Sequence, residues 1–504
     1  MLKIQVGHSY FLAYDPKQWE RGKPYPPLAT IQVAALLRQM GHQVALFDAM
    51  LATGVEDYQA ALQSTRPDVV VLYEDNFNYL TKMCLGRMRE AACQMIAEAR
   101  ADGARVIVAG SDASDHPDAF LAAGADAVLI GEGIAALIEL VGRLQRDPAI
   151  DTPRWVAGIA GVATLTNGQT QLTRVGVLPP DPRLIGHPAW DLVDVERYRA
   201  MWLERHGYFS LNMAASRGCP FRCNWCAKPI WGNHYNQRSA SDVAAEMTYL
   251  KRTFQPDHIW LADDIFGFRV DWVGEFAGHL ADADGSVPFT IQTRADLISE
   301  RMAAALEHAG CAEAWIGAES GSQRVLDAMN KGTRVADLIA ARARLGEHGI
   351  RVGFFIQLGY QGEQLVDLLA TRELITQAVP DDIGVSVSYP LPGTKFYEQV
   401  KAQLGAKTHW QDSGDLAMMF RGAYDSDFYR HVRDLLHEQV VLQQSKAAQS
   451  PQQHREARAA FEARWAALIA DERAHRSEDA TAPAPATTPD HAEPARHAAT
   501  AQHR

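Results

Sequence analysis

Cysteine is scarce in this chain of 504 residues, which has six cysteines in all, three of them within eight positions. Six cysteines are too few for a disulfide framework in a chain of this length, so a small crosslinked fold is excluded. The crowding of three of them indicates a metal site instead. We expect the others, Cys84, Cys93 and Cys311, to be buried core thiols.

Positive charge is also in deficit, because 49 Lys and Arg stand against 61 Asp and Glu, for a net charge of −12. This balance disfavours nucleic acid or an anionic membrane as the main partner, since both require a basic surface. The chain lacks an apolar run near the ~20 residues that span a bilayer, and its start lacks the apolar core of a secretory signal. We therefore expect a cytoplasmic protein without a membrane span.

Apolar runs of strand length alternate with helical periodicity over residues 1–148. Strands that alternate with helices in this way predict an α/β fold, a doubly wound Rossmann-like (flavodoxin-like) domain with a parallel sheet. The expected strands are 3–6, 44–47, 68–72, 105–109 and 127–130, and the expected helices are 27–40 and 83–100.

Four further regions follow the first domain. Residues 149–204 are rich in proline and are interpreted as a connector with a few strands of its own. Residues 205–400 return to β/α alternation, and their six units predict a partial (β/α)6 barrel. Residues 401–474 are predicted to be a helical carboxy-terminal region, and residues 475–504 a disordered tail. The expected barrel strands lie near 209–214, 258–262, 288–292, 313–317, 352–357 and 383–388.

The three crowded cysteines, Cys219, Cys223 and Cys226, form C-x3-C-x2-C directly after the first expected barrel strand. Three thiolates on one tight loop can hold three irons of a [4Fe–4S] cluster and leave the fourth iron open to another ligand. A structural zinc site is the alternative, but it needs a fourth protein ligand. His234 is the nearest candidate, and it lies outside the loop without the usual paired spacing.

This loop resembles that of the radical S-adenosylmethionine (SAM) superfamily in its spacing, in Trp225 before the last cysteine, and in its place after the first barrel strand. The resemblance implies that the open iron is chelated by the amino and carboxylate groups of SAM. It further implies that an electron from the cluster cleaves a carbon–sulfur bond to give a 5′-deoxyadenosyl radical. Trp225 is then expected among the SAM-binding residues.

Later barrel segments resemble the same superfamily and imply further SAM contacts. Asp263 and Asp264 follow the second strand and are expected near the SAM ammonium group, although two carboxylates after a strand more often cap a helix. Arg294, at the mouth of the third strand, could bind a carboxylate with two hydrogen bonds. Glu319 and Ser320, at the fourth strand, are expected near the SAM ribose and carboxylate.

The first domain resembles the cobalamin-binding class of the superfamily, in which backbone at glycine-containing strand ends approaches the cofactor. Gly110 and Ser111 follow one expected strand, and Gly131, Glu132 and Gly133 follow the next. These five residues are the expected cobalamin contacts.

The D-x-H-x-x-G motif that would supply a lower histidine ligand is missing, since Asp115-His116 does not fit it. The resemblance therefore implies a cobalamin without histidine on cobalt. The alternative is a domain that has lost its cofactor and serves only as a scaffold. A nicotinamide site is disfavoured, because no G-x-G-x-x-G follows the first strand.

The two domains in this order predict a cobalamin-dependent radical SAM methyltransferase that acts on an unactivated carbon of a small-molecule metabolite. An external electron donor of the flavodoxin or ferredoxin type is expected to reduce the cluster. The alternative is an oxidative cyclase or oxidoreductase, because residues 410–420 and 428–437 resemble the anaerobic magnesium-protoporphyrin IX monomethyl ester cyclase. An RNA methylthiotransferase is disfavoured, since the first domain lacks a second cysteine trio.

Overall fold

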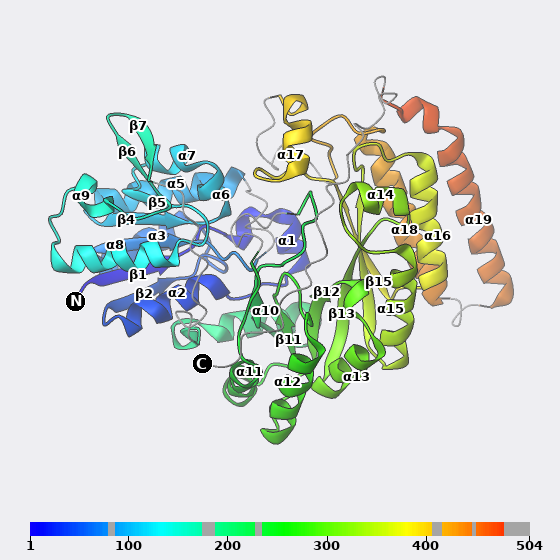
Figure 1. The fold of residues 1–504 in the computed structure, drawn as a ribbon, viewed down its shortest axis with the longest axis horizontal. Coiled ribbons are helices and arrows are strands. Elements are labelled where there is room, and N and C mark those ends of the chain that lie inside the picture. The colour runs from blue at the N-terminus through cyan, green and yellow to red at the C-terminus, as the bar shows by residue number, and fades with distance from the viewer. Residues whose placement is uncertain (79–85, 174–186, 227–233, 406–415, 446–449, 478–504) are drawn as a thin grey trace, which may run out of the picture.

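The computed structural model describes residues 1–78, 86–173, 187–226, 234–405, 416–445 and 450–477. Two sheets with their covering helices lie side by side, the first drawn in blue and cyan and the second mostly in green in Figure 1. Cys84, expected to be a core thiol, and residues 478–504 of the predicted disordered tail lie outside the described residues. No helix within the described part of the chain is long and apolar enough to cross a membrane.

The first sheet has the strand order β2-β1-β3-β4-β5-β6-β7, and its first five strands pair in parallel. Strands β3 and β5 are buried along their whole length, as expected where helices cover both faces of a parallel sheet. The flavodoxin-like prediction is confirmed. The strands are β1 (Lys3–Gly7), β2 (Gln43–Phe47), β3 (Val69–Tyr73), β4 (Arg105–Ala109) and β5 (Ala127–Leu129), and the helices are α1 (Pro16–Arg21), α2 (Leu28–Gln39), α3 (Val55–Thr65), α5 (Gly86–Ala101), α6 (Ser111–Asp115), α7 (Pro117–Ala122), α8 (Ile134–Arg146) and α9 (Thr152–Val156).

An antiparallel hairpin, β6 (Val162–Thr166) and β7 (Gln169–Leu172), extends this sheet at β5. Its turn is Asn167-Gly168, with φ angles of 51° and 73°. Two left-handed residues in succession form the type I′ turn that suits a two-residue hairpin. The predicted connector thus contributes the edge of the first sheet.

The second sheet has six parallel strands in the order β15-β14-β13-β12-β11-β8 and is a partial barrel, as predicted. Helices alternate with its strands in the chain. The strands are β8 (Ser210–Met213), β11 (His258–Leu261), β12 (Phe289–Thr293), β13 (Cys311–Glu319), β14 (Arg351–Leu358) and β15 (Asp382–Val387), a short ladder is made by β9 (Ser216–Arg217) and β10 (Asn236–Gln237), and the helices are α11 (Ala240–Phe254), α12 (Val270–Asp282), α13 (Glu300–Ala309), α14 (Gln323–Ala328), α15 (Val335–Glu347) and α16 (Leu365–Ala378).

The segment that follows α1, residues 22–27, joins the two parts, and α1 lies between them in Figure 1. Tyr25 is half-buried, and its hydroxyl lies 3.1 Å from the Ser210 hydroxyl on β8. The Trp202 indole of α10 (Val195–His206) donates to the Pro24 carbonyl at 2.7 Å. The residues between β1 and α2 therefore pack against the barrel and hold its position relative to the first sheet.

In the described part of the carboxy-terminal region the α-helices are α17 (Lys395–Val400), α18 (Ser426–Ser445) and α19 (Pro451–Ala470). Helices α18 and α19 lie beside α16 on the side of the barrel away from the first sheet (Figure 1). The Arg372 guanidinium lies over the rings of Phe461 and Trp465, 5.3 and 4.9 Å from their centroids. The predicted helical region is thus present where the structure describes it.

Candidate functional site

The cysteine loop leaves the carboxyl end of β8 and is closed at its base by the antiparallel ladder of β9 and β10. Gly218, with a φ of 76°, turns the chain from β9 toward Cys219. Asp263 accepts hydrogen bonds from the Ala215 N–H at 3.1 Å and from the Ser216 hydroxyl. Burial raises the pKa of Asp263 to about 7, although these donors lower it. Asp263 therefore anchors the base of the loop, while the neighbouring Asp264 is half-buried.

Asn224, between the second and third cysteines, ties the loop to the barrel. Its N–H donates to the Met329 carbonyl at 3.0 Å, and its side-chain amide donates to the Ala328 carbonyl at 2.7 Å. Its side-chain oxygen accepts from the Tyr360 hydroxyl at 3.0 Å, and its carbonyl accepts from the Phe396 N–H at 3.0 Å. Sequence reasoning missed this residue, and its only signal was a short polar side chain inside the cysteine loop.

Two cationic side chains lie beside Cys223. Arg294 Nη1 donates to Cys223 Sγ at 3.8 Å, and Arg294 Cζ lies 3.8 Å from the Phe221 ring centroid. Lys331 is buried, and its Nζ lies 2.8 Å from Glu319 Oε1. Burial lowers the pKa of Lys331, but Glu319 and Cys223 together raise it above its ordinary value. Two cationic groups, one of them paired with Glu319, therefore lie near Cys223.

Glu319 has a φ of 61° at the end of β13, where the register with β14 shifts. Left-handed backbone is rare for a residue with a side chain and often marks a functional site. A Cβ on Gly317 would lie 2.7 Å from both Glu319 Oε1 and Lys331 Nζ. Gly317 therefore leaves space for this ion pair beside the strand.

The remaining predicted SAM contacts differ in whether their polar atoms already have hydrogen-bond partners in the protein. The forked donors of Arg294 already face Asp296, with Nε and Nη2 at 2.9 and 3.1 Å from its two oxygens. The Ser320 hydroxyl lies 3.2 Å from the Thr371 hydroxyl on α16. The Trp225 indole N–H is buried and has no hydrogen-bond partner among the described residues. A bound ligand could satisfy Trp225, whereas Arg294 and Ser320 have protein partners.

The turn after β5 holds three of the five predicted cobalamin contacts. Gly131 and Gly133 have φ angles of 77° and 66°, and a Cβ on Gly133 would lie 2.6 Å from the Leu129 Cβ. The Gly131 N–H donates to the Ser114 hydroxyl at 3.0 Å, and the Tyr73 hydroxyl donates to the Glu132 carbonyl at 2.7 Å. The glycines are thus required by the backbone of this turn.

The turn after β4 holds the other two, Gly110 and Ser111. A Cβ on Gly110 would lie 2.7 Å from the Glu74 Cγ, so the close approach requires glycine. The Ser111 hydroxyl lies 3.5 Å from the Asn76 side-chain oxygen, after β3. The structure therefore brings all five predicted residues together at the carboxyl ends of β3, β4 and β5.

A histidine does follow β1, but protein partners surround it. His8 Nε2 lies 3.0 Å from Asp48 Oδ1 and 3.1 Å from the Ala49 nitrogen, and His8 Nδ1 lies 3.3 Å from the Tyr10 nitrogen. Burial lowers the pKa of His8, but Asp48 and nearby carboxylates raise it above its ordinary value. His8 therefore has a structural environment, and the absence of a histidine ligand on cobalt stays a prediction.

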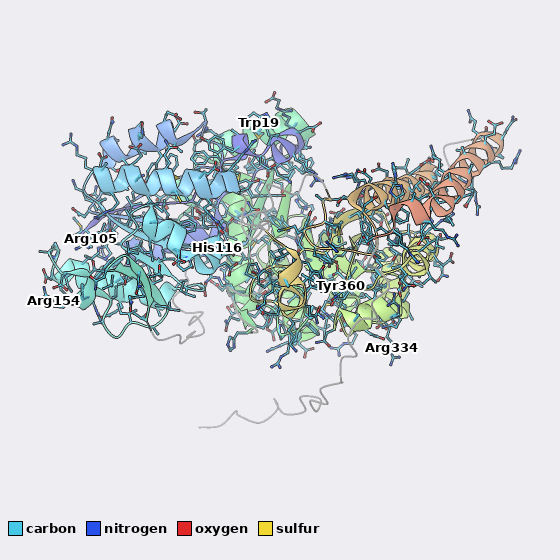
Figure 2. All side chains as sticks on the ribbon, turned by 90° about the horizontal axis from the view of Figure 1, so that it is seen from above. Trp19, Arg105, His116, Arg154, Arg334 and Tyr360 are labelled. Carbon is cyan, nitrogen blue, oxygen red and sulfur yellow. The ribbon has the colours of Figure 1, made fainter. Side chains whose placement is uncertain are left out.

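The carboxyl edge of the first sheet faces the barrel. Figure 2 shows His116, after α6, on the barrel side, and Arg105 and Arg154 on the side away from it. Arg105 begins β4, so the chain runs toward the barrel along this strand. The turns after β4 and β5 consequently lie on the side of the cysteine loop.

The donor groups present fit the two cofactors that the sequence resemblance implies. Within the described residues no three His, Cys, Asp or Glu side chains are close enough to hold one metal ion. A cluster binds each cysteine through a different iron and does not require that spacing. On the cobalamin side, Asn76 Nδ2 and Glu132 Oε2 are buried without a hydrogen-bond partner among the described residues. Unsatisfied buried atoms at a glycine-lined edge suit a polar cofactor.

Two family models match the chain. The radical SAM superfamily matches residues 213–375, and the B12 binding domain matches residues 20–141. The first match runs from the end of β8 through the cysteine loop to α16, and the second contains β2 to β5 with the two glycine-containing turns. The two matches imply a [4Fe–4S] cluster, SAM and cobalamin as cofactors.

Known relatives are similar over most of this length. An uncharacterised methyltransferase of Pyrococcus horikoshii is 24% identical over 389 residues, covering 75% of this chain and 79% of the relative. The anaerobic magnesium-protoporphyrin IX monomethyl ester cyclase of Rubrivivax gelatinosus is 24% identical over 287 residues, covering 55% of this chain and 49% of the cyclase. The radical SAM methyltransferase TsrM of Kitasatospora setae, with cobalamin and a [4Fe–4S] cluster bound, has the same fold at a TM-score of 0.63 and 18% identity, covering 81% of this chain and 76% of TsrM. The chain is therefore a radical SAM enzyme of the class that carries a B12 binding domain.

Proposed function

We propose that this protein is a cobalamin-dependent radical SAM methyltransferase that replaces C–H by C–CH3 at an unactivated carbon of a small-molecule metabolite. The observation that carries the proposal is that Arg217, two residues before Cys219, contacts Glu132 in the turn after β5, so that the cysteine loop and the predicted corrinoid surface lie at one interface. A methyl carrier and a radical source must both reach one substrate carbon, and this arrangement brings their sites together. The greater coverage of the methyltransferase relative, compared with the cyclase, supports the same reaction.

In this proposal Cys219, Cys223 and Cys226 hold the cluster. When bound, cluster and SAM together supply the 5′-deoxyadenosyl radical, for which a one-electron donor of the flavodoxin or ferredoxin type is required. Lys331 and Glu319 lie beside Cys223 as an ion pair, and each can exchange its partner for a polar group of SAM. Trp225, Asp264 and Ser320 are assigned to the walls of the same site, whereas Asp263 holds the base of the loop.

Gly110, Ser111, Gly131, Glu132 and Gly133 are assigned to cobalamin, which when bound would carry a methyl group from SAM to the substrate. The glycines permit close approach of the backbone, and Glu132 has one buried oxygen free of protein donors among the described residues. The turns themselves are fixed by hydrogen bonds to Ser114 and Tyr73. They therefore offer a preformed surface that loses little freedom on binding.

The test is anaerobic reconstitution of the full chain with iron, sulfide and hydroxocobalamin, followed by desalting and an absorption spectrum. We expect a cluster band and a retained corrinoid band. The variant Cys223→Ala should lose the cluster band and keep the corrinoid band. A wild-type protein with cluster but without corrinoid would remove the methylation mechanism and leave the first domain as a scaffold.

A cyclase is the second candidate, and the likeness to the porphyrin enzyme favours it. SAM labelled in its methyl group separates the two once a substrate is found. Label in the product identifies a methyltransferase, whereas an unlabelled product that has lost hydrogen identifies an oxidative cyclase.

A further inference from the structure

Arg217 joins the cysteine loop to the turn after β5. It lies on β9, two residues before Cys219, and is buried with only 8% of its surface exposed. Its Nη1 donates to Glu132 Oε1 at 2.5 Å, and its Nη2 donates to the Gln32 side-chain oxygen of α2. Its guanidinium lies over the Phe77 ring, 5.4 Å from the centroid. These three residues belong to the first domain: Gln32 lies on α2, Phe77 after β3 and Glu132 after β5.

The partner of Arg217 belongs to the predicted corrinoid surface. Glu132 lies between Gly131 and Gly133, is 5% exposed, and has its carbonyl fixed by the Tyr73 hydroxyl. Its second oxygen, Oε2, is buried without a hydrogen-bond partner among the described residues. The Glu132 carboxylate thus contacts Arg217 through Oε1, and its Oε2 can accept from a further donor.

Burial restricts the movement of the contact between Arg217 and Glu132. Both charged groups are buried, so water cannot replace either partner when the other moves. A guanidinium that donates to several acceptors keeps a defined orientation. The base of the cysteine loop is held on its other side by Asp263 through Ala215. A displacement of the turn after β5 must therefore be followed by β9 or must break a buried ion pair.

We propose that Arg217 is a positioning residue that couples occupancy of the cobalamin site to the geometry of the cluster loop. The inference rests on the proposed function, because it takes the turn after β5 as a corrinoid contact. Binding on one side orders Glu132, Arg217 and β9, and this order favours binding on the other side. Such coupling is reciprocal, so either cofactor strengthens the binding of the other by the same factor.

The experiment measures the dissociation constant of hydroxocobalamin on the full chain, once with the reconstituted cluster and once without iron and sulfide. We expect the wild-type protein to bind it at least about fivefold more tightly with the cluster present, the lower end of typical coupling. In Arg217→Lys, which keeps the charge and loses the fork, this ratio should fall toward one. The double variant Arg217→Met with Glu132→Gln leaves no unpaired buried charge and should show the same loss.

Tyr198→Phe is the matched control, because the Tyr198 hydroxyl of α10 donates to Asp48 at 2.6 Å without touching the cysteine loop. This variant should keep the wild-type ratio. A second readout is the rate at which a chelator removes iron from the oxidised cluster, which hydroxocobalamin should slow in the wild type and in Tyr198→Phe but not in the Arg217 variants.

Three outcomes would overturn the inference. A wild-type ratio of one excludes coupling, an unchanged ratio in both Arg217 variants excludes this residue, and an equal loss in Tyr198→Phe shows general loosening of the interface. If the wild-type protein binds no hydroxocobalamin, the proposed function fails together with the inference. If the wild-type protein binds hydroxocobalamin but the Arg217 variants keep its ratio of dissociation constants, the inference fails and the proposed function stands.

Discussion

Arg294 illustrates how the surroundings of one residue define its role. Its forked donors face Asp296, a further bond reaches the Lys331 carbonyl at 2.8 Å, and only Nη1 reaches Cys223 Sγ. A donor to a cluster thiolate stabilises the reduced, more negative cluster and raises its potential. The geometry therefore points to the cluster at least as strongly as to the predicted SAM carboxylate.

The variant Arg294→Gln should lower the reduction potential of the reconstituted cluster by tens of millivolts, where about 59 mV is a tenfold change for a one-electron couple. Potentiometric titration followed by electron paramagnetic resonance measures this. Arg301→Gln is the control, since Arg301 is exposed on α13 and pairs with Asp271 on the surface. An unchanged potential in Arg294→Gln would show that the contact with Cys223 has no electrostatic effect.

Glu363, after β14, predicts a pH dependence. Burial raises its pKa from 4.5 to about 8, although the Gly359 N–H that donates to it at 2.6 Å lowers it. The unfolded chain loses this proton near pH 4.5 and the folded chain near pH 8, so stability falls as the pH rises between these values.

The Glu363→Gln variant has no titratable carboxyl at this position. Its free energy of unfolding should therefore lack the fall with pH that Glu363 causes. We expect the variant to gain stability relative to the wild type between pH 5 and pH 8, by roughly a few kcal/mol. Thermal unfolding of both proteins at several pH values measures the difference. A constant difference across this range would contradict the raised pKa.

At the scale of elements, close backbone contact between β13 and α16 depends on glycine. A Cβ on Gly321, just after β13, would lie 2.2 Å from the Ala370 carbonyl oxygen of α16. Backbone cannot yield to such a contact as the end of a flexible side chain can. The position of α16 against the end of β13 therefore needs a residue without a side chain.

Gly321→Ala should consequently lower the melting temperature by about 1–3 °C, the effect of roughly 1–3 kcal/mol of overpacking in a chain of this size. Gly274→Ala in α12 is the control, because no atom lies within 4 Å of its added Cβ. That change should stabilise the helix by roughly 0.5–1 kcal/mol. Equal melting temperatures for the two variants would argue against the close contact.

At the scale of the whole molecule, the joint between the two sheets is made by α10 and residues 22–27. Trp202 is 1% exposed and donates to the Pro24 carbonyl. The Tyr25 ring packs against the rings of Trp202 and Trp260, with centroid distances of 5.3 and 5.0 Å. Aromatic side chains of this size dominate the energy of an interface. The two sheets should therefore unfold together while this joint is intact.

Trp202→Ala should destabilise the joint by about 3–5 kcal/mol and separate the unfolding of the two parts into two calorimetric transitions. Trp19→Ala is the matched control, since Trp19 on α1 is 43% exposed and labelled in Figure 2. We expect its unfolding to resemble that of the wild type. A single unchanged transition in Trp202→Ala would show that other contacts hold the two parts together.

The sequence by itself determined which elements form and which cofactor chemistry they carry. The apolar runs that became β1 to β5 and the six barrel strands are local patterns, since periodicity is a property of neighbouring residues. The cysteine spacing and the glycine-containing turns are local in the same way. Cys311, expected in the core, is buried, while Cys93 is only partly buried.

Only the tertiary structure decided how these local pieces meet. The pairing of β6 with β5, the bonds of Asn224 to three distant segments and the contact of Arg217 with Glu132 join residues that are far apart in the chain. Such contacts depend on the packing of whole elements, because their geometry is set only when both partners are fixed. For this reason Asn224, Lys331 and Arg217 had no signal in the sequence that distinguished them from other polar residues.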